Sequence, residues 1–346
     1  MFKLLEEYGH EQVVFGCDKE TGLKAIIGVH NTVLGPALGG TRMWNYKSEE
    51  DAIYDVLRLS RSMTLKNSAA GLNLGGGKAV IIGDPLKLKN EKFLLAYGKF
   101  VDSLNGNYIT AEDVNIGVND AEIIRKATKH VVGLYGENKS GDPSPFTARG
   151  VYKGIEAASK EKFGCSSLDG LSVAIQGLGK VGYELGRLLK EGGAKLIVSD
   201  INPLIVNKAV MELDAKAVST EEILTVDCDI FAPCAMGAVL SINNIPGLKC
   251  KMVAGAANNV LVNNDAGNEL VKRGILYIPD YIINAGGVIN ISMEIDGRYD
   301  VNKVTKKVDE IYDNVKNLLN FAKAEGLPTH LAADKFAMDR INKATR

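Results

Sequence analysis

Lys78 is the residue of this sequence best suited to act as a base. It follows three glycines and opens the apolar run Ala79–Ile82, which predicts a buried strand that ends at residues 83–85. The glycines carry no side chains, so a ligand could approach their backbone closely. Desolvation at the mouth of the strand should lower the pKa of Lys78 from about 10.4 toward neutrality, as a general base requires. The competing interpretation is a flexible glycine loop with a solvated lysine.

A second lysine, Lys66, stands twelve residues earlier, near the end of a predicted helix. Ser48 caps this helix, and apolar residues from Ile53 to Met63 repeat at helical spacing, so the helix packs by one face. Met63 and Lys66 are three residues apart and project to the same side. Two lysines converging on one pocket would bind a carboxylate and lower each other's pKa. Alternatively, Lys66 only complements the helix dipole.

Asp113 is the candidate partner of Lys78. It lies near the end of a predicted strand, 107–114, that also contains Ala111 and Glu112. Paired acids at a strand end are mostly solvated. Asp113 therefore gains a chemical role only if this strand ends beside the strand of Lys78.

The second half of the chain contains a dinucleotide-binding fingerprint. A strand at 171–176 leads directly into Gly177-Leu178-Gly179-Lys180-Val181-Gly182, a helix follows, and the next strand ends in Asp200. The glycines permit a tight turn and place a pyrophosphate at the helix N-terminus. Asp200 would accept hydrogen bonds from the ribose hydroxyls and repel a 2′-phosphate, so NAD is predicted rather than NADP. Alternatively, Asp200 only caps the next helix.

Further strand and helix patterns continue through the second half. A strand at 229–234 ends in Cys234 and is followed by Ala235, and small residues of this kind suit a strand tip beside a cofactor. Ligands of open parallel sheets bind at the carboxyl ends of the strands. We expect one long helix from residue 301 to about 326, and a helix at 119–130 that Asn119 caps.

Composition and length predict two α/β domains. The chain has 346 residues, 46% hydrophobic and 24% charged, with a net charge of −1, so neither nucleic acid nor an anionic membrane is an expected partner. We expect a substrate and catalytic domain at 1–132 and a Rossmann-type dinucleotide-binding domain at 133–326, with a cleft between them. The C-terminal helices, about 327–346, would pack back onto the first domain.

The five cysteines are odd in number and form neither a CxxC pair nor zinc spacing. This pattern favours reduced thiols and gives no reason to expect a metal. The acidic start of the chain argues against a signal peptide, and no apolar run is long enough to span a membrane. A cytoplasmic protein is therefore expected.

The sequence resembles the glutamate, leucine, phenylalanine and valine dehydrogenase family, and its leucine-acting members most closely. The family's active-site signature matches from Leu72 through Lys78 to Asp84-Pro85 without a gap. Other matching runs are GPALGGTRMW (35–44), YITAEDV (108–114), CDIFAPCA (228–235) and PDYIINAGGVIN (279–290). The resemblance covers nearly the whole chain. It implies an NAD-dependent dehydrogenase that is a homo-oligomer, although the C-terminal tail is shorter than in octameric members.

By position, the resemblance implies that Lys78 and Asp113 are catalytic and that Lys66 binds the substrate carboxylate. It implies further substrate contacts at Leu38, Gly39, Gly40, Met63, Ala111, Asn259, Val288 and Ile291. Thr147 and Asn258 would approach the nicotinamide. The chain departs from the family at Lys180 and Gly182 in the dinucleotide turn, and at Arg149, which replaces a tyrosine.

The expected reaction is reversible oxidative deamination of a branched-chain L-amino acid to its 2-oxo acid and ammonia. A glutamate side-chain carboxylate buried in the pocket would require a cation. Glutamate dehydrogenases place a lysine where this chain has Leu38, so the resemblance implies that glutamate is disfavoured. Phenylalanine or another hydrophobic amino acid is the alternative substrate. A more distant alternative is a dinucleotide-binding regulator without activity, which the joint presence of both lysines, Asp113 and the fingerprint argues against.

Overall fold

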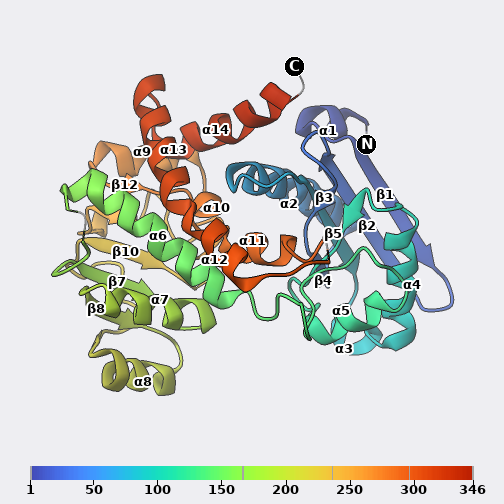
Figure 1. Ribbon diagram of the computed structural model, residues 1–346, viewed down its shortest axis with the longest axis horizontal. Coiled ribbons are helices and arrows are strands. Elements are labelled where there is room, and N and C mark those ends of the chain that lie inside the picture. The colour runs from blue at the N-terminus through green and yellow to red at the C-terminus, as the bar shows by residue number, and fades with distance from the viewer. Residues whose placement is uncertain (1, 166, 236, 296, 345–346) are drawn as a thin grey trace. The chain divides into compact units, whose positions relative to one another are not determined.

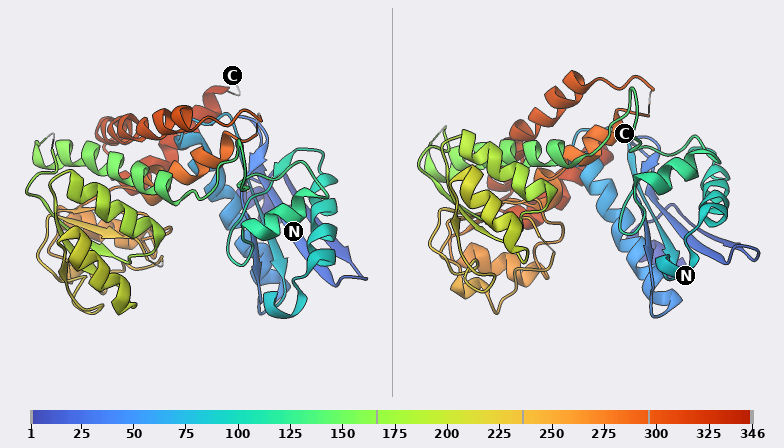
Figure 2. Two further views of the ribbon diagram at one scale, coloured as in Figure 1. Left: turned by 60° about the horizontal axis from the view of Figure 1, so that its bottom comes forward. Right: turned by 90° about the horizontal axis from the view of Figure 1, so that it is seen from below.

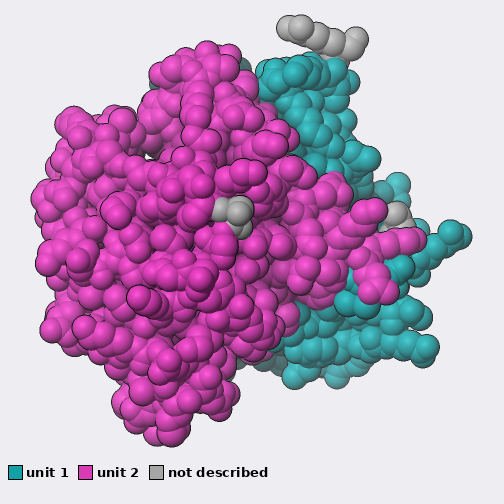
Figure 3. All heavy atoms as spheres, turned by 60° about the vertical axis from the view of Figure 1, so that its left-hand side comes forward, with its two compact units in different colours: residues 1–142, 290–301, 337–346 teal, residues 143–289, 302–336 magenta. Residues whose placement is uncertain are grey.

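The structure is a computed structural model that describes residues 2–165, 167–235, 237–295 and 297–344 (Figures 1 and 2). It divides into two compact units (Figure 3). The first unit comprises Met1–Asp142, Asn290–Val301 and Ala337–Arg346, and the second comprises Pro143–Ile289 and Asn302–Phe336. The second unit thus begins at Pro143 rather than at the expected residue 133, and the first contains two segments from late in the chain.

The first unit is built on a six-stranded mixed sheet in the order β1-β2-β5-β3-β6, with β4 also paired to β5. Its strands are β1 (Gln12–Asp18), β2 (Leu23–Asn31), β3 (Ala37–Leu38), β4 (Thr41–Trp44), β5 (Gly75–Ile82) and β6 (Tyr108–Ile109). Its helices include α1 (Phe2–Tyr8), α2 (Glu49–Ala69), α3 (Pro85–Leu88), α4 (Glu91–Asp102) and α5 (Val118–Arg125). β1, β2 and β5 are antiparallel neighbours, whereas β3 and β4 run parallel to β5.

Alternation along the strands divides the core of this unit into two layers. Ile26 and Val80 pack with Val56 and Leu57 of α2 on one face of the sheet. Residues of opposite parity, including Ile27 and Ala79, pack with α4 and α5 on the other face. Figure 2 shows α2 in light blue beside the blue strands. The sheet therefore has an α2 face and an α4 face.

Three local predictions for the first unit were wrong. The strand expected at 107–114 ends at Ile109, because Thr110 and the residues after it bond to other segments and Asp113 closes a turn with Ile116. Helix α5 begins after Gly117 rather than at Asn119, since the Asp120 carboxylate accepts from the Gly117 N–H. β5 begins at Gly75, so Lys78 is the fourth residue of the strand rather than its first.

The second unit is a doubly wound parallel sheet in the order β12-β11-β10-β7-β8-β9. Its strands are β7 (Ser172–Gln176), β8 (Lys195–Ser199), β9 (Lys216–Ala217), β10 (Ile230–Pro233), β11 (Met252–Val253) and β12 (Leu276–Tyr277). The chain winds outward from β7 to β9 and then returns to start again at β10 beside β7. The strand order therefore reverses between β7 and β10, the position where Rossmann-type sheets bind dinucleotides.

The remaining helices are α6 (Ser144–Phe163), α7 (Lys180–Glu191), α8 (Pro203–Leu213), a 3₁₀ turn at Ile245–Gly247, α9 (Asn264–Lys272), α10 (Asp280–Ile283), α11 (Gly286–Ser292), α12 (Val301–Asp309), α13 (Ile311–Glu325) and α14 (Thr329–Ala344). The single helix expected at 301–326 is therefore two helices, which meet at Glu310 without a proline or glycine there. Arg149 of α6 forms a two-bond ion pair with Asp309 of α12.

Two buried histidines lie under α2 in the first unit. His10 bonds to Ser60 and His30 to Thr64, and the two ring centroids are 4.8 Å apart. Burial lowers the pKa of each imidazole to about 4. An unfolded histidine has a pKa of about 6.5, so between pH 4 and 6.5 the unfolded chain binds more protons than the folded chain and stability falls as pH falls.

We expect the free energy of unfolding to decline between pH 6.5 and 4 by up to about 3 kcal/mol for each histidine. Urea unfolding of the wild type and of His10→Gln/His30→Gln at several pH values measures this slope. The double variant should lose much of the slope, and the carboxylates common to both proteins account for the remainder. Equal slopes would contradict the assignment of neutral buried histidines.

Candidate active site

Lys78 lies in the middle of the first sheet, on its α2 face. Its register partner on β2 is Gly28, whose side-chain position would lie 3.0 Å from Ser60 Oγ of α2. Two residues before Lys78, the side-chain position of Gly76 would lie 2.0 Å from the backbone nitrogen of Thr64, also on α2. Since strand residues two apart share a face, the lysine projects toward α2, and its side chain is only 8% exposed.

The glycines before Lys78 make room for the protein itself. Side chains at Gly75 and Gly76 would overlap the Asn31 carbonyl and the backbone of α2, and one at Gly77 would overlap the Tyr108 ring. The prediction that these glycines open space for a ligand was therefore wrong. Their function is to let α2 and Tyr108 pack directly against the strand that carries Lys78.

Asp113 meets Lys78 from the turn that follows β6. Its Oδ2 atom lies 2.9 Å from Lys78 Nζ and 3.1 Å from Arg42 Nε. Burial acts to raise the pKa of the Asp113 carboxyl, but the charges of Lys78 and Arg42 outweigh it and hold the pKa below its usual value. The condition set for Asp113, a position beside the strand of Lys78, is thus met.

The Gly39–Gly40 segment lies against Asp113 and against Gly77, the residue before Lys78. A side chain at Gly39 would overlap the Gly77 carbonyl and lie 3.2 Å from Met63 Cγ, while one at Gly40 would lie 3.0 Å from Asp113 Cβ. Tyr108 donates to the Gly39 carbonyl at 2.6 Å. These contacts bring Gly39, Gly40 and Met63 together with the Lys78–Asp113 pair.

Four other residues expected at the substrate site lie in the first unit. Leu38 is fully buried, and its carbonyl accepts from Asn67 of α2. Ala111 is buried, and its carbonyl accepts from the Thr41 N–H. Lys66 is partly buried in the last turn of α2, the helix that covers the face carrying Lys78. Ile291 lies 3.7 Å from the side-chain position of Gly133.

The dinucleotide turn occupies the reversal point of the second sheet. Gly177 has a positive φ of 95°, and its side-chain position would lie 2.7 Å from Ala235 Cβ, just after β10. A side chain at Gly182 would overlap the Gly177 carbonyl and lie 3.1 Å from Cys234 Cβ, whereas no atom lies within 4 Å of that position at Gly179. The turn is therefore tight on its inner side and open at Gly179, where α7 begins, as a pyrophosphate cradle requires.

Asp200 follows β8, and both of its carboxylate oxygens accept backbone N–H groups. Leu178 N donates to Oδ2 at 2.6 Å and Asn202 N donates to Oδ1 at 2.8 Å. The capping residue of α8 is Asn202 rather than Asp200. Asp200 is therefore joined directly to the dinucleotide turn, and Lys180 and Val181 of that turn begin α7.

The other expected contacts of the second unit lie in the loop between β11 and α9 and in helices α6 and α11. Asn258 accepts from Asn284 Nδ2 at 2.9 Å, and Asn259 has a left-handed backbone with φ 51°. Thr147 donates to the Pro143 carbonyl, and its hydroxyl lies 2.7 Å from the side-chain position of Gly287, next to Val288.

Comparisons with known proteins agree with this arrangement. Residues 10–130 match the profile "Glu/Leu/Phe/Val dehydrogenase, dimerisation domain", and residues 208–346 match "Glutamate/Leucine/Phenylalanine/Valine dehydrogenase". Leucine dehydrogenase of Geobacillus stearothermophilus is 55% identical over 342 residues, which is 99% of this chain and 93% of that protein. The chain belongs to the Glu/Leu/Phe/Val dehydrogenase family. It is therefore an amino-acid dehydrogenase, and the family's enzymes use a nicotinamide cofactor.

Relatives within the family differ in their substrates. An L-tryptophan dehydrogenase of Nostoc punctiforme is 48% identical over 347 residues, covering 100% of this chain and 97% of that protein. The crystal structure of an L-tryptophan dehydrogenase from that organism has a TM-score of 0.90 at 46% identity, with 100% of this chain and 99% of that chain covered. The fold is thus shared between family members that act on different amino acids.

Arg42 and Asp55 are site residues that the sequence reasoning missed. Arg42, on β4, contacts Asp113 and also Asp55 of α2, at 3.1 Å in each case. Asp55 additionally accepts from Tyr46 and Arg58. The available signal was the GPALGGTRMW run, which contains Arg42 and which the resemblance singled out without assigning it a role.

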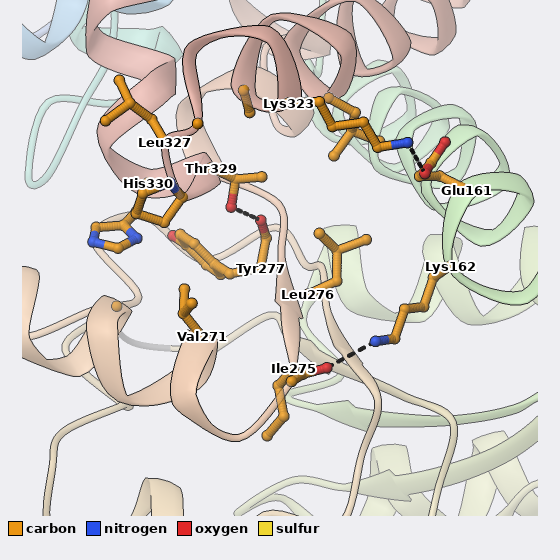
Figure 4. Close-up of a pocket in the computed structure, with 16 residues that line it drawn as sticks. Glu161, Lys162, Val271, Ile275, Leu276, Tyr277, Lys323, Leu327, Thr329 and His330 are labelled. Carbon is orange, nitrogen blue, oxygen red and sulfur yellow. Dashed lines mark hydrogen bonds and ion pairs between the residues drawn. The ribbon is translucent and has the colours of Figure 1, made fainter.

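A cavity of about 440 Å³ lies within the second unit, lined by residues other than those of the candidate site (Figure 4). Tyr277, Val271, Ile275, Leu276, Leu327 and His330 are among its lining residues. None of the predicted substrate, cofactor or catalytic residues lines it.

Within the described part of the chain, no group of acidic, cysteine or histidine residues has the arrangement of a metal site. No described helix is long and apolar enough to cross a bilayer.

Proposed function

We propose that this protein catalyses the reversible NAD+-dependent oxidative deamination of a branched-chain L-amino acid to its 2-oxo acid and ammonia. The observation that carries the proposal is the pairing of buried Lys78 with partly exposed Asp113, 2.9 Å apart and bordered by Gly39, Gly40 and Met63. Oxidative deamination needs a base and a proton carrier at one carbon atom, and a paired lysine and carboxylate can supply both.

Each polar residue has a separate role in this proposal. Lys66 binds the substrate carboxylate as a point charge. Lys78 activates the water that attacks the imine carbon and stabilises the oxyanion that develops. Asp113 carries protons to and from the departing amine. The dinucleotide turn Gly177–Gly182 would hold the pyrophosphate and Asp200 the ribose; when bound, the nicotinamide supplies the hydride acceptor.

The substrate side chain is proposed to meet the apolar residues Leu38, Met63, Ala111 and Ile291 of the first unit. Val288 and Asn259 of the second unit are proposed as further substrate contacts. No cation stands at Leu38 to pair with a glutamate side chain. The 52–55% identical leucine dehydrogenases support a branched-chain substrate. An aromatic substrate is the second candidate, because the 48% identical relative is an L-tryptophan dehydrogenase.

The proposal is tested by steady-state kcat/KM with NAD+ as the cofactor and NADH absorbance as the readout. The substrates to compare are leucine, isoleucine, valine, phenylalanine, tryptophan and glutamate. We expect the three branched-chain amino acids to lead, within about 1–3 kcal/mol of one another. Highest efficiency with tryptophan or phenylalanine would instead support the second candidate. No turnover with any amino acid would favour a dinucleotide-binding regulator.

Cofactor choice is proposed to depend on Asp200. Its carboxylate, fixed by Leu178 N and Asn202 N, would repel the 2′-phosphate of NADP+, and such repulsion costs several kcal/mol. Asp200→Ser should therefore raise KM for NAD+ and improve the use of NADP+. Asn202→Ser, which keeps a helix cap, is the matched control and should leave the preference unchanged. Equal wild-type efficiency with both cofactors would contradict this assignment.

The proposal extends to assembly and location. The name of the matching N-terminal profile, which includes "dimerisation domain", supports a homo-oligomer. All five cysteines are free, as expected for a reducing, cytoplasmic compartment. Light scattering in solution would give the oligomeric state.

A further inference from the structure

Two cations share one oxygen of Asp113. Lys78 Nζ and Arg42 Nε both approach Oδ2, at 2.9 and 3.1 Å. Among the contacts of the described residues, none is made by Oδ1, and the Asp113 side chain is 25% exposed. One oxygen is thus held while the other is available to a substrate group.

Arg42 is itself held in place from its far side. β4 runs parallel to β5 with Arg42 opposite Val80, so the arginine projects from the sheet face that α2 covers. There its Nη1 donates to Asp55 Oδ2, which also accepts from the Tyr46 hydroxyl at 2.7 Å. The guanidinium therefore bridges α2 and the Asp113 turn in one defined orientation.

We infer that Arg42 is a positioning residue that keeps Asp113 ionised and oriented throughout the reaction. The inference rests on the proposed function of Lys78 and Asp113. Lys78 must alternate between its charged and neutral forms in order to act as a base. Whenever Lys78 is neutral, Asp113 loses one of the two charges that stabilise its carboxylate. Burial meanwhile continues to favour the protonated form of Asp113.

Arginine cannot take part in that alternation, because its guanidinium keeps its proton at any working pH. It therefore supplies a constant positive charge 3.1 Å from Asp113. Among the described residues, the charged groups that act most strongly on the Asp113 carboxyl are Lys78 from β5 and Arg42 from β4, with Asp55 and Tyr46 behind Arg42. Of these, Arg42 alone is a cation in contact with Asp113 whose charge does not change during turnover.

The first test is the pH dependence of kcat/KM in Arg42→Gln, which retains hydrogen bonding but loses the charge. Loss of the Arg42 charge should raise the pKa of the Asp113 carboxyl. The acidic limb of the kcat/KM profile should therefore move to higher pH by about one unit or more, and kcat should fall. Arg42→Lys, which restores a positive charge, should bring the limb back toward the wild-type position. Arg58→Met is the matched control, because Arg58 contacts Asp55 but not Asp113, and it should leave the limb in place.

An unchanged acidic limb in Arg42→Gln would overturn the inference while leaving the proposed function intact. An inactive wild type would instead contradict the proposed function itself.

A second measurement needs neither activity nor an Arg42 variant. In Lys78→Ala, Arg42 is the remaining cation beside Asp113, so the Asp113 carboxyl should stay ionised at neutral pH. The NMR signal of ¹³C-labelled aspartate, assigned with Lys78→Ala/Asp113→Asn, reports its titration. Protonation of Asp113 near pH 7 in Lys78→Ala would overturn the inference.

Discussion

Replacing Lys78 with alanine is expected to lower kcat by about 10²–10⁴-fold, the usual contribution of a general acid–base residue, while NADH still binds. The loss follows from the position of Lys78, because the amine nearest to Asp113 would be removed from the site. The dinucleotide turn is made by separate residues of the second unit, so cofactor affinity should change little.

Single-turnover absorbance measures the loss of catalytic rate, and the quenching of NADH fluorescence measures NADH binding separately. Lys87→Ala is the matched control, since Lys87 is a largely exposed lysine beyond the same strand and should retain full activity. Asp113 keeps Arg42 as a counter-ion in Lys78→Ala, so the variant should fold. A kcat close to that of the wild type would refute the catalytic assignment.

Replacing Gly76 with alanine is expected to lower the free energy of unfolding by about 3 kcal/mol, the upper end of the usual cost of overpacking. The added methyl would lie 2.0 Å from Thr64 N and 2.4 Å from Thr64 Cα. These are helix backbone atoms, so α2 must move away from the sheet. Because α2 also carries Met63 and Lys66, KM for the amino acid should rise as well.

Gly117→Ala is the matched control for this effect. Gly117 has an ordinary φ of −95° and no atom within 4 Å of the added methyl, so only a small loss at the start of α5, about 1 kcal/mol at most, is expected. Urea unfolding and KM for leucine should be measured on both variants. The comparison is between Gly76, whose side-chain position is occupied by α2, and Gly117, whose side-chain position is open. Equal stability of the two would show that α2 does not pack as closely as the structure indicates.

Local patterns in the sequence were sufficient for the dinucleotide turn and the elements on either side of it. The strand, glycine turn, helix and acidic residue are contiguous, and each one depends on backbone geometry over only a few residues. β7, α7 and β8 accordingly lie where the spacing predicts them. The helix at 301–326 was predicted less well, since nothing in its composition marks the break at Glu310.

The first unit was harder to predict because its chemistry depends on residues distant in sequence. The resemblance pointed to Lys66, Lys78 and Asp113, and periodicity located the helix that carries Lys66. The role of the three glycines was misread, since a glycine run shows only that something approaches closely. Only the packed structure identifies the neighbours as α2 and Tyr108.

The sequence alone determines the α/β class, the two βα-rich halves, the dinucleotide turn and the candidate lysines. These features depend on periodicity and on short-range backbone preferences. Tertiary structure decided which charges meet. Arg42, Asp55, Lys78 and Asp113 come from four separate segments, and their pairing is set by sheet register and by the position of α2. Coulomb interactions act over a few ångströms in space whatever the separation in the chain, so the network around Asp113 became visible only in the folded protein.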